Sequence, residues 1–107
     1  MTTNRATVLL AIDAYVEMAN AHPSVPSGYS YVADPSGSKY RIVMVDNGGS
    51  RSVHSFVDLN TGDLLKAAGW KVAAKGVRYN LLAEMELLAE MFDWAGGYLY
   101  AGARKDR

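Results

Sequence analysis

Four basic and two aromatic side chains are concentrated between residues 66 and 79, in the stretch of the chain best suited to binding an anion. They are Lys66, Trp70, Lys71, Lys75, Arg78 and Tyr79, and no acidic residue occurs between Asp63 and Glu84. Lysine and arginine neutralise phosphates, and aromatic faces stack on nucleobases. The stretch therefore predicts a site for nucleic acid or another polyanion.

The same stretch also has a purely structural interpretation, which the sequence favours. A basic run is more often a solvated loop, and Trp70 could fill the core instead of facing a ligand. The exposure of Trp70 separates the two interpretations. An exposed indole beside the lysines would favour stacking, whereas a buried indole would make the loop structural.

The last apolar segment offers a second candidate surface. Residues 81–95 carry apolar side chains over more than half of a helix circumference, and Leu87, Met91 and Trp94 widen the main stripe. The excess over what one sheet face buries could contact a host protein or form a homodimer. Burial of the whole segment inside the domain is the alternative, and it is slightly favoured for a small domain.

Enzymatic and metal chemistry have little support in this sequence. The chain has no cysteine, and its histidines, His22 and His54, are far apart in sequence, which excludes thiolate ligands and paired-histidine spacing. Serines and Asp58 lie near His54, but neither a nucleophile elbow nor a phosphate-binding glycine motif is present. We therefore expect no catalytic residue, no metal and no cofactor.

Hydrophobic periodicity defines the elements that must position these residues. Residues 3–21 predict an amphipathic helix that ends before Pro23. Strands are expected at 28–33, 39–45, 51–59 and 64–67, separated by turns at 34–37, 46–49 and 60–63. Alternation along the third strand places His54, Phe56 and Asp58 on one face. A loop at 68–79 and a final helix at 81–95 complete the chain, and residues 98–100 either add an edge strand or pack on the core.

This order of elements, α-β-β-β-(β)-α, predicts an α+β fold and a single domain over residues 1–107. Short hairpins give an antiparallel sheet of three to four strands, flanked by an N-terminal and a C-terminal amphipathic helix that cover one face. The eleven basic and eleven acidic residues cancel, so only a local patch could attract nucleic acid. No apolar run approaches the length of a membrane span, and we expect no membrane association.

Residues 52–78, about a quarter of the chain, resemble a stretch in small accessory proteins of tailed bacteriophages, especially those of actinobacteria. The ending Ala-Gly-Gly-Tyr-Leu-Tyr at 95–100 is also similar, whereas Ala73-Ala74 stands where those proteins carry alanine-proline. The resemblance implies a phage protein that acts in the host cytoplasm, and it supplies no catalytic residues. We therefore expect a non-catalytic binding protein that uses residues 66–79 or, alternatively, the apolar C-terminal helix.

Overall fold

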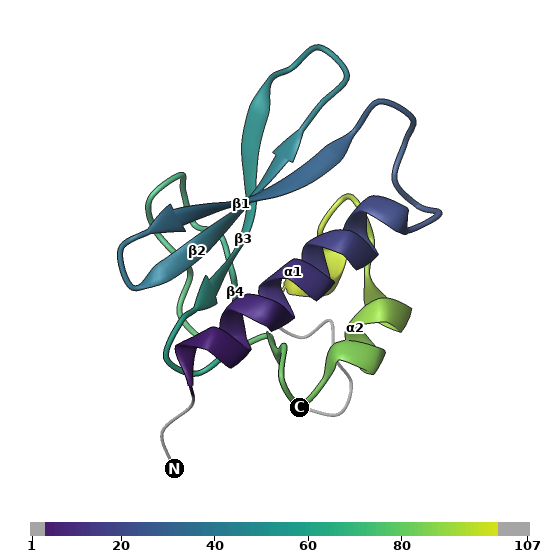
Figure 1. Cartoon of the computed structure of the whole chain (residues 1–107). Helices are drawn as coiled ribbons and strands as arrows, with labels where there is room; N and C mark the ends of the chain where they lie inside the picture. Colours follow the sequence, from purple (N-terminus) through teal and green to yellow (C-terminus); the bar gives the residue numbers. More distant parts are fainter. Residues whose placement is uncertain (1–3, 101–107) are drawn as a thin grey trace.

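An antiparallel meander of five strands forms the centre of the fold, and two helices lie on one of its faces (Figure 1). The computed structural model describes residues 4–100. The strands are β1 (Ser30–Ser36), β2 (Lys39–Val45), β3 (Arg51–Asp58), β4 (Asp63–Lys66) and β5 (Tyr79–Asn80), and each pairs with the next. The predicted α+β class is confirmed, and the two-residue β5 adds a strand to the predicted three or four.

The edge strand β1 runs through the segment that was expected to be a turn. Pro35 lies inside β1 opposite Tyr40, and the turn follows at Gly37, where φ is +64°. Proline cannot donate a ladder hydrogen bond, but an edge strand leaves half of its amide groups unpaired in any case. The prediction that residues 34–37 form the turn is therefore wrong by two to three residues.

The first helix, α1 (Arg5–Ala21), matches its predicted pattern. The side chain of Asn4 caps its start by accepting from the Ala6 amide at 2.8 Å. The buried stripe consists of Val8, Ile12, Tyr15 and Ala19. At the other end, the Asn20 amide exchanges two hydrogen bonds with the backbone of Tyr31, which fixes α1 to β1.

The final helix is much shorter than the prediction over 81–95. Asn80 does cap a turn, since its Oδ1 accepts from the amides of Leu82 and Ala83, but α2 covers only Met85–Met91. Phe92 adopts extended geometry, and the 3-10 helix η1 (Gly97–Leu99) follows. A straight helix through residue 95 would carry Tyr98 and Leu99 away from the core, whereas the observed path buries both. Tertiary burial therefore outweighs helix propensity here. Of the two predicted roles for 98–100, packing on the core is correct.

A buried tyrosine pair joins α1 to η1. The hydroxyls of Tyr15 on α1 and Tyr98 on η1 are 2.6 Å apart. Burial raises the pKa of Tyr15 to about 12, so both hydroxyls stay protonated at neutral pH. This hydrogen bond holds the C-terminal segment against α1.

Among the described residues, no helix is both long and apolar enough to span a membrane.

Candidate functional site

Residues 66–79, which we call the basic loop, form a tightly hydrogen-bonded excursion between β4 and β5. The Ala74 amide donates to the Lys66 carbonyl at 2.7 Å, and Ala67 forms a bridge with Ala73. At the tip, the amides of Ala68 and Gly69 both donate to the Val72 carbonyl. The loop therefore has a defined shape that presents Trp70 and Lys71 at its turn.

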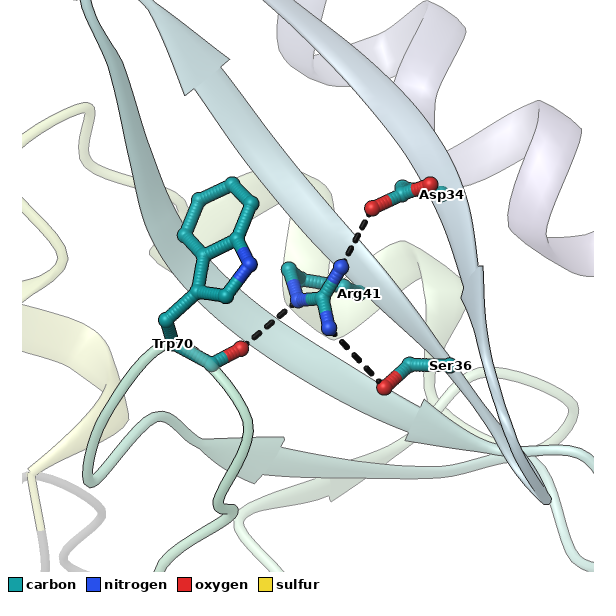
Figure 2. Close-up of polar contacts among 4 residues, drawn as sticks. All are labelled: Asp34, Ser36, Arg41 and Trp70. Carbon is teal, nitrogen blue, oxygen red and sulfur yellow. Dashed lines mark hydrogen bonds and ion pairs between the residues drawn. The ribbon is translucent and has the colours of Figure 1, made fainter.

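Trp70 lies on the sheet face opposite α1, where its indole packs on a buried arginine (Figure 2). Ile42 faces the helices, so the preceding residue, Arg41, points to the other side. The Arg41 guanidinium lies 4.6 Å from the centre of the indole, and its Nε donates to the Trp70 carbonyl at 2.7 Å. Trp70 itself remains 40% exposed. One part of the indole is thus anchored while another part faces solvent.

Residues of β1 and β3 also contact the Arg41 side chain. Its guanidinium pairs with the Asp34 carboxylate and donates to Ser36 Oγ at 3.0 Å, both on β1 (Figure 2). The guanidinium also lies over the ring of Phe56 on β3. Because Arg41 is only 7% exposed, these contacts replace the water it loses. The arginine therefore ties the loop tip to β1 and β3.

The cations of the basic loop fall into two groups. Lys71 and Lys75 are exposed, and within residues 4–100 neither pairs with an acidic side chain. Lys66 is partly buried, with its Nζ 4.7 Å from the centre of the Tyr100 ring. Arg78 donates through Nε to the Leu99 carbonyl at 2.6 Å and also binds carbonyls at residues 75 and 76. Two lysines therefore face solvent, whereas Lys66 and Arg78 contact the protein.

Tyr79 does not belong to the exposed surface. Its side chain is fully buried on β5, where it packs against the ring of Tyr98. The prediction that Tyr79 could stack on a ligand is therefore wrong, because alternation along the chain leading into β5 points it to the core. Of the two predicted aromatic residues, Trp70 alone remains accessible.

The predicted partner surface on the last helix is largely occupied. Leu87 packs against the core, and Trp94 contacts the ring of Tyr29 with centroids 5.5 Å apart. The Trp94 backbone accepts a hydrogen bond from the Tyr31 hydroxyl. Met91 is 36% exposed. The structure therefore buries Leu87 and Trp94 in part and leaves Leu82 and Met91 exposed.

A β-bulge gives His54 a position that sequence alternation did not predict. Ile42 pairs with Ser55 and Val43 pairs with Val53, so His54 is an extra residue on β3. The bulge turns its ring toward the helices, away from the face that carries Phe56. The predicted sharing of a face by His54 and Phe56 is therefore wrong. Such a bulge depends on strand pairing, and no residue near 54 signals it locally.

The ring of His54 lies among three aromatic rings. Its centroid is 5.2 Å from that of Tyr31, 5.8 Å from Phe92 and 5.9 Å from Tyr98. Burial lowers the pKa of His54 to about 4, and the nearby Asp93 offsets this only in part. The imidazole is therefore neutral near pH 7.

The polar neighbours of His54 do not form a catalytic triad. Nδ1 lies 3.3 Å from Ser55 Oγ. Asp58 instead organises the turn after β3, where its Oδ1 accepts from the Asn60 amide at 2.7 Å. Within residues 4–100 no three acidic or histidine side chains come close enough together to hold a metal ion.

Comparison with known proteins identifies a family. The chain matches no curated protein and no solved structure. A family model described as a family of unknown function (DUF7717) matches residues 5–101, which include both α-helices, all five strands and the whole basic loop. The chain therefore belongs to this family of unknown function, DUF7717.

Proposed function

We propose that the chain is a non-catalytic binding protein that holds nucleic acid or another polyanion on the basic loop. The observation that carries this proposal is the 40% exposed indole of Trp70, which stands beside Lys71 at the tip of an ordered loop. An exposed aromatic ring next to a cation is the combination that binds an unpaired base and its phosphate.

The anchoring of Trp70 supports this role because it reduces the cost of ordering the site. Arg41 fixes both the backbone carbonyl and one part of the indole. A side chain that is already held loses less conformational entropy when a ligand stacks on it. The remaining exposed part of the ring is available to a base.

The charge of the loop supports the same partner. Lys71 and Lys75 are exposed, and the basic loop contains no acidic residue to neutralise them. Each phosphate that a lysine neutralises releases condensed counterions, which gives affinity that falls as salt rises. Because stacking needs an unpaired base, we expect single strands to bind more tightly than duplexes.

The test is fluorescence anisotropy with labelled single-stranded and double-stranded DNA and RNA of mixed sequence, at low and at physiological salt. The double variant Lys71→Ala/Lys75→Ala should bind more weakly, and the slope of log affinity against log salt should fall by about 0.7 for each lost contact with a single strand. Trp70→Phe keeps a ring for Arg41 to pack on but offers less surface, and it should weaken binding to single strands selectively.

A matched control removes two positive charges elsewhere. Arg5 lies at the start of α1 and Arg51 at the start of β3, next to a hairpin that points away from the basic loop (Figure 1). The variant Arg5→Ala/Arg51→Ala should retain most of the binding. Equal losses in the two double variants would mean that only overall charge matters, and an absence of binding at low salt would refute the proposal.

The resemblance to phage proteins extends the proposal to a cellular setting. On that resemblance alone, we propose that the chain is a phage accessory protein that acts in the host cytoplasm. If no polyanion binds, the partner surface around Met91 becomes the next candidate, for a host protein or a second copy of the chain. Sedimentation of the purified protein would then measure its self-association.

A further inference from the structure

A cavity lies beside the part of β3 that does not pair with β4. The last residue pair between β3 and β4 is Ser55 with Lys66, so the part of β3 before residue 55 has no partner on that side. The segment from Trp94 to Tyr100 passes over this gap and leaves a cavity of about 400 Å³. Its volume lies in the range of small-molecule sites in proteins.

The walls of the cavity are mainly apolar and aromatic. Met44 and Val53 contribute from the sheet, and Trp94, Leu99 and Tyr100 contribute from the C-terminal segment. Two aromatic side chains in a cavity of this size favour a planar ring as the occupant.

Lys66 supplies the charge of the cavity and is its single charged lining residue among those the structure describes. Its ammonium has three N–H donors, of which one reaches the Ala67 carbonyl at 3.3 Å. The same group lies 4.7 Å from the centre of the Tyr100 ring. A cation held beside an aromatic wall, with donors to spare, favours an anionic group on the occupant.

His54 adds an independent observation at the same site. It lines the cavity, and although the residue as a whole is partly exposed, its Nε2 atom is shut off from solvent and has no well-aligned hydrogen-bond partner within residues 4–100; the weaker polar contacts of the ring are with Ser55 Oγ and the Asp93 backbone. A Cβ atom on Gly96, another wall residue, would lie 3.7 Å from Nε2. Buried polar atoms are rarely left unpaired, because each one gives up its hydrogen bonds with water and gains none in return. The backbone at Gly96 lies next to Nε2, so a polar group in the cavity can pair with Nε2 when this backbone shifts.

We propose that this cavity binds a small planar aromatic anion. Lys66 binds the negative group, Trp94 and Tyr100 contact the ring, and a shift of the backbone at Gly96 lets His54 Nε2 pair with a polar substituent. This site shares Lys66 with the basic loop but uses neither Trp70, Lys71 nor Lys75, on which the polyanion proposal depends, so either proposal can fail without the other.

The size of the occupant sets the expected affinity. A compound of about ten non-hydrogen atoms is small enough that we expect weak binding, with a Kd of about 1 mM. A suitable probe is 4-hydroxybenzoate, which combines a carboxylate, one ring and a hydroxyl. The neutral analogue 4-hydroxybenzamide has nearly the same shape without the charge.

The experiment is a titration of the isotope-labelled protein with each probe, followed by NMR. We expect 4-hydroxybenzoate to shift the amide signals of Lys66 and Gly96, the indole signal of Trp94 and the Nε2 resonance of His54. Lys66→Met should weaken binding by about tenfold or more, since a partly desolvated ion pair is worth about 1.4 kcal/mol or more. Lys39→Met, at the opposite end of β2, is the matched control and should bind like the unchanged protein.

The neutral probe makes the test independent of any mutation. If Lys66→Met fails to fold, 4-hydroxybenzamide must still bind the unchanged protein about tenfold more weakly than 4-hydroxybenzoate. Equal binding of the two probes, shifts that map to another surface, or no shifts at about 1 mM probe would each overturn the proposal.

Discussion

Replacing His54 with phenylalanine should remove a specific part of the acid sensitivity of this protein. The pKa of His54 is about 4 in the folded chain, against the ordinary histidine value of 6.5 in the unfolded chain. The unfolded chain therefore takes up a proton first as the pH falls. The contribution of His54 to stability is fully present above pH 6.5 and is lost progressively between pH 6.5 and about 4.

The size of this loss follows from the gap between the two pKa values. Each pKa unit is worth about 1.4 kcal/mol, so the gap between 6.5 and about 4 corresponds to about 3 kcal/mol in the free energy of unfolding. For a domain of this size, 3 kcal/mol is a large part of the total stability. Phenylalanine keeps a ring between Tyr31, Phe92 and Tyr98 and has no proton to gain.

The assay is urea denaturation of both proteins at several pH values from 7.5 to 4. Carboxylates titrate in both proteins, so the difference between the two curves isolates His54. We expect the His54→Phe variant to gain about 3 kcal/mol relative to the unchanged protein as the pH falls across this range. Parallel curves would refute the reasoning, because they would mean that the imidazole titrates equally in the folded and unfolded chains.

Three further substitutions test the Arg41 ion pair and two of the turns. Asp34→Asn removes the charged partner of Arg41, which is 7% exposed, and urea denaturation should show a loss of about 2 kcal/mol; an unchanged midpoint would mean that the ion pair contributes nothing. Gly62→Ala forces a side chain into φ of +79° with its Cβ 3.1 Å from Leu82, whereas Gly37→Ala has open space at φ of +64°. Thermal denaturation should show that Gly37→Ala costs about 1 kcal/mol and Gly62→Ala more, and equal losses would rule out a steric role for Leu82.

Elements whose signals are local could be predicted from the sequence. Residues 39–45 form a β-prone run that lies between two turn signals, and β2 covers those same residues. The first helix has both an asparagine cap and a proline just after its end, and α1 begins within two residues of the predicted start. In both cases the residues that define the element are inside it or next to it.

Features that depend on tertiary pairing could not be predicted. The early end of α2 follows from the burial of Tyr98 and Leu99, which lie beyond the helix. The orientation of His54 follows from a bulge that exists only when β3 pairs with β2. Sequence alternation contains neither piece of information.

The candidate site likewise has features that the sequence predicts and features that depend on tertiary contacts. Composition identified the basic loop, and Trp70, Lys71 and Lys75 are accessible there. The anchoring of Trp70 by Arg41 joins residues 29 positions apart and has no signature in the sequence. The cavity beside Lys66 likewise combines the middle of the chain with residues 94–100.

The order of strands in the meander has a consequence for how the chain folds. Because each strand pairs with the next, the sheet can form through short-range contacts with small loop-closure cost. The hydrogen bond between Tyr15 and Tyr98 instead joins residues 83 positions apart. The sheet can therefore assemble before α1 and η1 meet, and the segment from Trp94 to Tyr100, with the cavity that it lines, is the part expected to dock last and to open first.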